Sequence, residues 1–175
     1  MTPTTAASVV LRPAESDDVP AIAEVFRASR EAAMPWLPAL HTPDEDLAFF
    51  GGQVREHAAY VAELDGRLVG FAVVDEATHE LDHLYLAPDV RRRGIGRALL
   101  DHARARHDGP LELWAFAGNR AARDFYAVCG AVELFETDGS GNEERMPDVR
   151  LELPAFRRDT VDRPGDRDVD PQVDQ

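Results

Sequence analysis

One segment of the chain places two glycines between the end of a predicted strand and the start of a predicted helix. The strand ends at Leu86, Ala87-Pro88 turns the backbone, and Gly94 and Gly96 open the helix. Glycine has no side chain, so backbone N–H groups can approach a ligand closely at these positions. A helix N-terminus adds unpaired N–H groups and partial positive charge. The segment therefore predicts a fold in which a strand and a helix together bind a pyrophosphate group.

Four arginines surround these glycines: Arg91, Arg92, Arg93 and Arg97. The whole chain has a formal net charge of −14, which argues against general affinity for nucleic acid or anionic lipid. A local basic cluster on an acidic protein suits a small polyanionic ligand. The alternative is that these arginines are only a solvent-exposed run of charge. The spacing of the glycines after a strand favours a ligand-binding site.

Two common nucleotide-binding motifs do not fit this segment. The dinucleotide-binding motif requires a third glycine three residues after Gly96, where the chain has Leu99. The phosphate-binding loop of nucleoside triphosphatases requires Gly-Lys-Ser/Thr, which the chain lacks. The chain therefore contains neither motif.

Hydrophobic periodicity divides the chain into strands and helices. We predict strands at residues 9–11, 59–62, 68–74, 80–86, 111–115, 132–135 and 149–153, and helices at residues 19–31, 43–52, 96–107 and 120–128. Asp65-Gly66 between two apolar runs is typical of a tight hairpin. The apolar alternation slips near Asp82-His83, which indicates a β-bulge or a strand buried on both faces. These elements predict an α/β sandwich, a central sheet with helices on both faces.

The length of 175 residues suits one domain followed by a short tail. We place the domain at residues 1–154 and expect the polar residues 155–175 to be disordered, because they hold few apolar side chains to bury. Cys129 is the only cysteine, which excludes an intrachain disulfide and fits a reducing compartment. No signal peptide and no apolar run of about 20 residues is visible, so we expect a cytoplasmic protein.

Two motifs of the chain resemble those of one known family. The spacing Arg91-x-x-Gly94-x-Gly96 is similar to the acyl-coenzyme A signature of the GCN5-related N-acetyltransferase (GNAT) family. A second signature of that family is also present, with Asn119, an alanine three residues later and the pair Phe125-Tyr126. The order of predicted elements matches the family over residues 9–153. The resemblance implies the GNAT fold, an α/β (α+β) architecture with a mixed, mostly antiparallel sheet of about seven strands and helices on both faces.

The resemblance also implies an activity, the transfer of the acetyl group of acetyl-CoA to a primary amine by direct attack in a ternary complex. That amine belongs to a peptide or protein N-terminus, a lysine or a small molecule. A non-catalytic acyl-CoA-binding module is the main alternative, and a nucleotide-binding protein is a third. Tyr126 favours the enzyme, because an inactive relative would be expected to lose it.

The resemblance implies specific roles at the coenzyme site. The backbones of Leu84, Tyr85 and Leu86 would pair with the pantetheine arm like an added strand, and the Leu86 N–H would face the developing oxyanion. Asn119 would lie at the pantetheine or the thioester. Tyr126, a phenol with an ordinary pKa of about 10, would give a proton to the departing thiolate, and a core aromatic is its alternative role. The pyrophosphate would be surrounded by Arg91, Arg92, Arg93, Gly94, Ile95, Gly96 and Arg97.

The general base is left open between two residues and a chain of water molecules. Glu80 comes first, because it lies four residues before Leu84, where several members of the family carry a catalytic glutamate. His83 comes second, because an ordinary histidine pKa of about 6.5 suits proton transfer at neutral pH. Each is also interpretable as a solvated polar residue of a strand. His79 and His83 cannot share a metal ion, since residues four apart in a strand lie roughly 13 Å apart, and we expect no metal site.

Two loops, residues 34–41 and 139–146, would line the acceptor side in this family. Trp36 and His41 are candidates for a wall of the acceptor site, and Glu143-Glu144 for a charge that attracts a cation. Trp36 has an alternative role in fixing its loop to the core. The expected partners are therefore acetyl-CoA and an amine, without nucleic acid or membrane, as a monomer or a homodimer.

Overall fold

A computed structural model of the protein describes residues 8–157. Within this range the strands form one seven-stranded sheet in the order β1-β2-β3-β4-β5-β7-β6, in which only β4 and β5 run parallel. The strands are β1 (Val9–Pro13), β2 (Ala58–Leu64), β3 (Arg67–Asp75), β4 (Glu80–Leu86), β5 (Leu111–Phe116), β6 (Val132–Thr137) and β7 (Asp148–Leu153). The mixed, mostly antiparallel sheet predicted from the sequence is confirmed.

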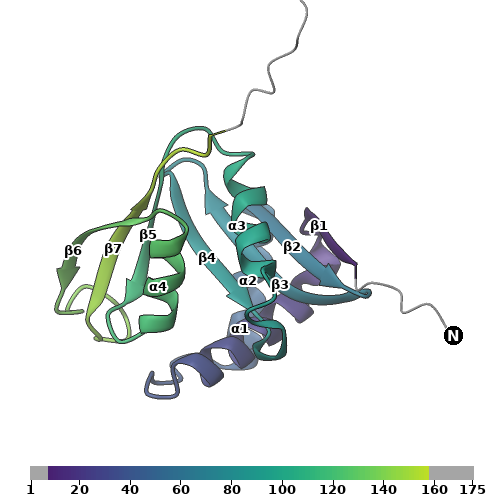
Figure 1. The fold of residues 1–175 in the computed structure, drawn as a ribbon. Coiled ribbons are helices and arrows are strands. Elements are labelled where there is room, and N and C mark those ends of the chain that lie inside the picture. The colour runs from purple at the N-terminus through teal and green to yellow at the C-terminus, as the bar shows by residue number, and fades with distance from the viewer. Residues whose placement is uncertain (1–7, 158–175) are drawn as a thin grey trace, which may run out of the picture.

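Helices cover both faces of this sheet. They are α1 (Val19–Ala33), α2 (Pro43–Glu56), α3 (Ile95–Arg104) and α4 (Arg120–Val128), with short 3-10 turns at η1 (Ser16–Asp18) and η2 (Pro88–Val90). α1 and α2 pack against each other behind the sheet, and α3 and α4 lie in front of it (Figure 1). The predicted arrangement of the helices is confirmed. Among the described residues, no helix is long and apolar enough to cross a bilayer.

Two local features predicted from the sequence are present in the sheet. The β2–β3 hairpin turns at Asp65-Gly66, where φ is 52° and 79°. Two consecutive residues with positive φ are typical of a type I′ turn. The β3–β4 register shifts between Val73 and Val74, which leaves Asp82 without a partner on β3. Asp82 is therefore the extra residue of a β-bulge, at the predicted position.

The predicted end of the second helix is wrong. We expected the second helix to end at Gly51-Gly52, but α2 continues to Glu56. Phe50 before the glycines is fully buried, and Val54 after them packs against the core. Burying each of these side chains stabilises the fold by about 2 kcal/mol. This gain exceeds the cost of about 1 kcal/mol for each glycine in a helix.

The packed chain continues beyond the predicted domain boundary at residue 154. The guanidinium of Arg104 donates to the carbonyl oxygen of Pro154 at 2.7 Å and lies over the ring of Phe156 at 5.4 Å. Residues 154–156 therefore pack against α3. Residues 158–175, which make up most of the tail predicted to be disordered, lie outside the described residues.

β4 and β5 touch at one end only. They pair at Glu80 and Glu112, and no further pairing joins them. β5 pairs instead along its other edge with β7, over its whole length. Arg150 of β7 closes the joined end, because its guanidinium binds Glu112 at 2.6 Å and Glu80 at 2.9 Å. From this end the two strands diverge (Figure 1).

Candidate active site

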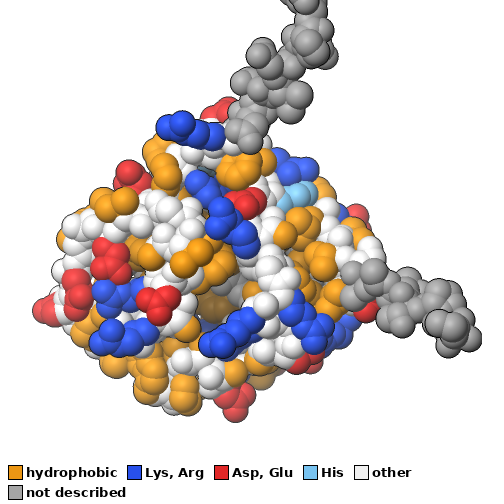
Figure 2. All heavy atoms as spheres, in the orientation of Figure 1, with side chains coloured by type: hydrophobic (Ala, Val, Ile, Leu, Met, Phe, Trp, Pro, Cys, Tyr) orange, Lys and Arg blue, Asp and Glu red, His pale blue; other side chains and the backbone are white. Residues whose placement is uncertain are grey.

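The divergence of β4 and β5 leaves a cavity of about 630 Å³, which we call the strand cleft. The two strands form its sides, and α4 and the β6–β7 loop contribute the other walls. Its lining side chains include Leu84, Tyr85, Trp114, Phe116, Asn119 and Tyr126. Figure 2 shows a hollow in the face that carries α3 and α4, with arginine side chains beside it. The strand cleft therefore brings β4 together with Asn119 and Tyr126 of the second motif.

The edge of β4 that faces the cleft has unpaired backbone groups. The Ala87 N–H donates to the Val69 carbonyl at 2.8 Å, so in the alternating antiparallel ladder Tyr85 also directs its backbone to β3. Leu84 and Leu86 direct their N–H and C=O groups the other way, toward β5, which does not pair with them. The predicted backbone pairing with an extended ligand is thus available to Leu84 and Leu86. It is not available to Tyr85, whose side chain lines the cleft instead.

The loop before α3 presents a row of unpaired N–H groups. None of the backbone N–H groups of residues 92–97 donates to another group of the described chain. Gly94 precedes α3 with φ of 77°, and Arg92 also has positive φ, 64°. Left-handed residues alternating with right-handed ones turn successive N–H groups to one side and form an anion-binding nest. The nest and the helix N-terminus together have the chemistry of a pyrophosphate site.

The arginines of this loop differ in their partners. Arg91 turns toward α1 and donates to the carbonyl and hydroxyl oxygens of Ser29, both at 3.0 Å. Arg97 forms an ion pair within α3. Arg92 and Arg93 are exposed, and neither has a hydrogen bond or ion pair with another residue in the range 8–157. Arg92 and Arg93 can therefore meet an anion, whereas Arg91 fixes the loop to α1.

Tyr126 reaches the strand cleft from α4 and is 8% exposed. Desolvation by burial raises its pKa above the usual value, and the nearby Tyr85 adds to the shift. The phenol therefore keeps its proton at neutral pH. Its hydroxyl has no hydrogen-bond partner in the part of the chain that the structure describes. It is available to donate to a group bound in the cleft.

Asn119 lines the same cleft, but both ends of its side-chain amide have partners. Its oxygen accepts the Ala122 N–H at 3.2 Å and caps α4. Its nitrogen donates to the sulfur of Met34 at 3.3 Å. Asn119 thus fixes the start of α4, and with it Tyr126, against the end of α1.

A second cavity, which we call the loop groove, adjoins the strand cleft and has a volume of about 760 Å³. Its walls come from α1, the loop between α1 and α2, the first turns of α2, β4 and the β6–β7 loop. Four residues line both cavities: Met34, Asp82, Tyr85 and Glu144. A molecule in the loop groove therefore lies next to the strand cleft.

Two ion pairs, which we call the loop clasp, join the loops that border this groove. Arg30 at the end of α1 binds Glu144 at 2.9 Å, and His41 Nε2 lies 3.0 Å from a carboxylate oxygen of Glu143. The hydrogen bond to Glu143 raises the pKa of His41. The two loops predicted to line the acceptor side are thus joined across the groove.

The sequence was compared with models of known families. The model of the acetyltransferase (GNAT) family matches residues 22–131, which contain β4, the loop before α3, and α4. The chain belongs to the GNAT family. It is therefore an acyltransferase, and most of the curated relatives that it matches are named N-acetyltransferases.

Curated GNAT relatives are named for different acceptors. The chain is 31% identical over 121 residues to the peptidyl-lysine N-acetyltransferase YiaC of Escherichia coli, covering 69% of this chain and 82% of the relative. It is 33% identical over 124 residues to the ribosomal protein bS18-alanine N-acetyltransferase of Salmonella typhimurium, covering 66% of this chain and 76% of the relative. The crystal structure of PaiA N-acetyltransferase from Thermoplasma acidophilum in complex with coenzyme A shares the fold. Its TM-score is 0.68 at 19% identity, over 84% of this chain and 99% of that one.

In this GNAT protein Trp36 lines neither cavity. Its ring meets Phe116 edge to face, with centroids 6.1 Å apart. It also packs over Gly118, where a Cβ would lie 3.1 Å from the indole. Trp36 therefore fixes the loop between α1 and α2 to the end of β5, which matches its alternative role. His41, the other predicted acceptor residue, does line the loop groove.

His83 lies in the wall of the loop groove among the rings of Phe26, Phe49 and Phe50. Desolvation by burial lowers its pKa to about 4. The imidazole is therefore neutral at physiological pH and a weak base. Its Nδ1 is buried without a hydrogen-bond partner among residues 8–157. These properties argue against the predicted role of His83 as general base.

Glu80 lines neither cavity. Its two carboxylate oxygens accept hydrogen bonds from Arg150 at 2.9 and 3.3 Å. It thus belongs to the joined end of β4 and β5 rather than to the place where the cavities meet. This position argues against the predicted role of Glu80 as general base.

Asp82 is a site residue that the sequence interpretation overlooks. It borders both cavities from the bulge of β4. Partial desolvation, followed by the negative charges of Glu80 and Asp75, raises the pKa of its carboxyl to about 6. The available signal in the sequence is a charged side chain at the predicted bulge, because bulges re-aim side chains next to active sites.

Proposed function

We propose that the protein transfers the acetyl group of acetyl-CoA to a primary amine by direct attack in a ternary complex. The observation that carries the proposal is the arrangement along β4 of the unpaired edge at Leu84 and Leu86, the N–H nest of residues 92–97, and Tyr126 in the same cleft. An extended pantetheine arm needs strand-like hydrogen bonds, and a pyrophosphate needs N–H donors and positive charge. The coenzyme A complex of a protein with this fold supports the choice of donor.

In the proposed reaction the amine nitrogen attacks the thioester carbon, an amide bond forms and the carbon–sulfur bond breaks. Negative charge develops first on the carbonyl oxygen, where the Leu86 N–H would stabilise it. It then passes to the departing sulfur, which would take the Tyr126 proton, while the proton that the attacking nitrogen loses would pass through solvent to restore the Tyr126 phenol. The raised pKa of Tyr126 keeps the phenol protonated at neutral pH, so a proton is present at the site.

The acceptor amine would enter through the loop groove. Asp82 lies where this groove meets the strand cleft, so its carboxylate can hold the amine beside the thioester. Glu144 lines both cavities as well, but it is paired with Arg30. We therefore place the acceptor amine at Asp82, instead of at Glu80 or His83.

The names of the relatives support a primary amine of a protein as the first acceptor to test. One relative is named for a peptidyl lysine and another for an alanine of a ribosomal protein. Both acceptors carry positive charge when protonated, which suits a groove lined by more carboxylates than arginines.

Thiol release from acetyl-CoA tests the proposal. The panel of acceptors contains a peptide with a free N-terminus, the same peptide with a blocked N-terminus and one lysine, and small primary amines. We expect one free thiol for each acetylated amine with at least one acceptor class. If calorimetry shows acetyl-CoA binding but no amine gives thiol release, the protein is the alternative, a non-catalytic acyl-CoA-binding module.

A further inference from the structure

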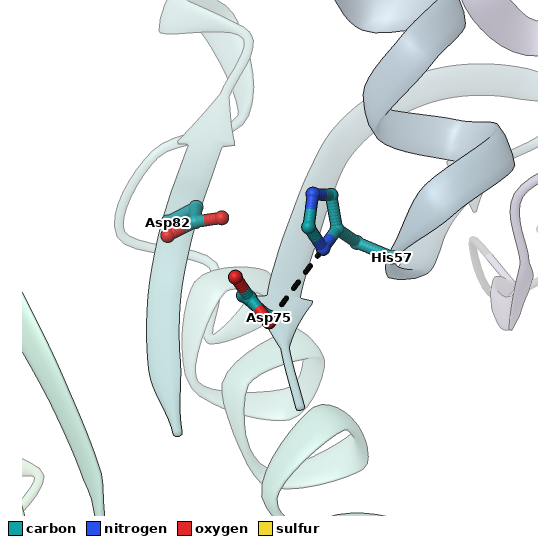
Figure 3. A group of neighbouring side chains, drawn as sticks. All are labelled: His57, Asp75 and Asp82. Atoms are coloured by element: carbon teal, nitrogen blue, oxygen red, sulfur yellow. Dashed lines mark ion pairs between the residues drawn. The ribbon is translucent and has the colours of Figure 1, made fainter. Parts of the chain in front are cut away.

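Three metal-ligating side chains converge beside β3 and β4, away from the nest of residues 92–97. His57 follows α2, Asp75 ends β3, and Asp82 is the bulge residue of β4. One ligand atom of each residue lies within 4.8 Å of the corresponding atoms of the other two. Figure 3 shows the three side chains pointing toward one another from three different elements.

Local structure orients Asp75, places His57 beside it, and leaves the exposed Asp82 facing both from the bulge. Asp75 Oδ1 accepts the Ala77 N–H at 2.8 Å in the turn after β3, which orients the carboxylate. His57 Nδ1 lies 3.8 Å from the same oxygen, and both side chains are 22% exposed. The bulge takes Asp82 out of the β3–β4 register and aims it toward the other two.

The two carboxylates of this group have no arginine partner among the described residues. Asp75 and Asp82 contribute two carboxylates, and among residues 8–157 no arginine forms an ion pair with either. Arg150 pairs instead with Glu80 and Glu112. Two neighbouring carboxylates repel each other, and a dication between them would neutralise both.

We propose that His57, Asp75 and Asp82 bind one divalent transition-metal ion of the zinc class. Bonds of about 2 Å to zinc place neighbouring ligand atoms about 3 to 3.5 Å apart, so the side chains need to close by about 1 Å. One imidazole and two carboxylates suit zinc, cobalt or manganese, whereas magnesium and calcium prefer oxygen ligands alone. Three protein ligands leave coordination positions open to water.

From the sequence we expected no metal site, but that expectation considered only His79 and His83. The proposed ligands come from three segments that are separated in the sequence and joined by the β3–β4 pairing and by the end of α2. Because Asp82 also borders both cavities, the ion would compete with the acceptor amine and inhibit acetyl transfer. This consequence rests on the proposed function, whereas metal binding itself does not.

Metal binding is tested without substrates, on the full chain free of any affinity tag and treated with a chelator. Calorimetry with Zn²⁺ measures affinity and stoichiometry, and visible absorption with Co²⁺ reports coordination by nitrogen and oxygen. We expect one ion per chain. His57→Ala and Asp75→Asn should each weaken binding by about tenfold or more. The asparagine keeps an oxygen for the Ala77 N–H, so the turn is preserved while the charge is lost.

The matched controls are His41→Ala and His79→Ala, which remove histidines that face Glu143 and His107 respectively. Both should bind the ion as the unchanged protein does. No binding up to about 1 mM Zn²⁺ or Co²⁺ would overturn the proposal. Binding that survives both His57→Ala and Asp75→Asn, or that either control abolishes, would also overturn it.

Thermal unfolding of each variant shows whether it is folded, and the isosteric Asp75→Asn decides the test if His57→Ala is not. In acetyl-transfer assays Zn²⁺ should inhibit the unchanged protein and His79→Ala more strongly than Asp75→Asn. A protein that binds the ion at these residues but acetylates no amine would refute the proposed function and leave the metal site standing.

Discussion

At the scale of single residues, a substitution of Tyr126 distinguishes the chemical step from the binding of acetyl-CoA. Its hydroxyl lies in the strand cleft without a partner among the described residues, while its ring is part of the core. Tyr126→Phe should therefore lower kcat by about 100-fold, the range of a lost general acid. The affinity for acetyl-CoA should change less than about twofold, and the free energy of unfolding by less than about 0.5 kcal/mol.

Thiol-release kinetics and calorimetry measure these two effects of Tyr126→Phe separately. An unchanged kcat would remove Tyr126 from the mechanism. A loss confined to KM would instead assign its hydroxyl to ground-state binding.

Arg91 and Arg93 are neighbours with different expected roles, which gives a matched pair of variants. Arg91→Ala removes the two hydrogen bonds to Ser29 and should lower the free energy of unfolding by about 1 to 2 kcal/mol. Arg93→Ala should leave stability unchanged but weaken acetyl-CoA binding by roughly threefold to tenfold, and less at high salt.

Urea unfolding and calorimetry at two salt concentrations measure the effects of the Arg91 and Arg93 variants. The assignment of roles would be reversed if Arg93→Ala destabilised the fold and Arg91→Ala did not.

At the scale of elements, the parts with a local cause were predictable. The hairpin at Asp65-Gly66, the bulge at Asp82 and most element bounds follow from hydrophobic period and turn chemistry over a few residues. Much of the acetyl-CoA site was predictable for the same reason, since residues 84–97 form one contiguous segment. The acceptor side was predictable only in part, because the resemblance indicates its two loops but not how residues 26–49, β4 and residues 143–144 come together around Asp82. The pairing of Glu80 with Arg150 likewise joins residues 70 positions apart.

The joined end of β4 and β5 gives a prediction about Glu80. If its carboxylate acts only in this clamp, Glu80→Gln should cost about 1 kcal/mol of stability and leave kcat within about threefold. Arg150→Met should cost more, about 2 kcal/mol, because it leaves Glu80 and Glu112 facing each other without a counter-charge. Urea unfolding and steady-state kinetics measure both. A fall of kcat by 100-fold or more in Glu80→Gln, about the loss of a general base, would restore Glu80 to that role.

The loop clasp gives a prediction about pH. The pKa of His41 is raised in the folded protein by Glu143, so this pair stabilises the closed loops fully below the ordinary histidine pKa of about 6.5. The stabilisation is lost as pH rises through the raised value. Trp36 lies in the same loop, so its fluorescence in a Trp114→Phe background should change with a midpoint above about 6.5. The matched variant His41→Gln should remove that transition, and its persistence would exclude the clasp as the cause.

At the scale of the whole molecule, all 19 basic side chains are arginines, and the chain contains no lysine. The enzyme therefore offers no side-chain amine of its own to its active site. This fact simplifies every assay of the acceptor, because acetyl-lysine formed in a reaction must belong to the substrate. The net charge of −14 can still act on acceptors as they approach the protein.

That charge should favour cationic acceptors by raising the rate of encounter. Two peptides with the same single lysine, flanked by arginines in one and by glutamates in the other, isolate the effect. At low salt the arginine peptide should have a kcat/KM about tenfold higher, and the difference should shrink as added salt shortens the screening length. Because the charge acts before the chemical step, kcat should be similar for the two peptides. Equal kcat/KM at low salt would show that the groove selects acceptors by contacts near the amine, at Asp82 and the loop clasp, rather than by the field of the whole protein.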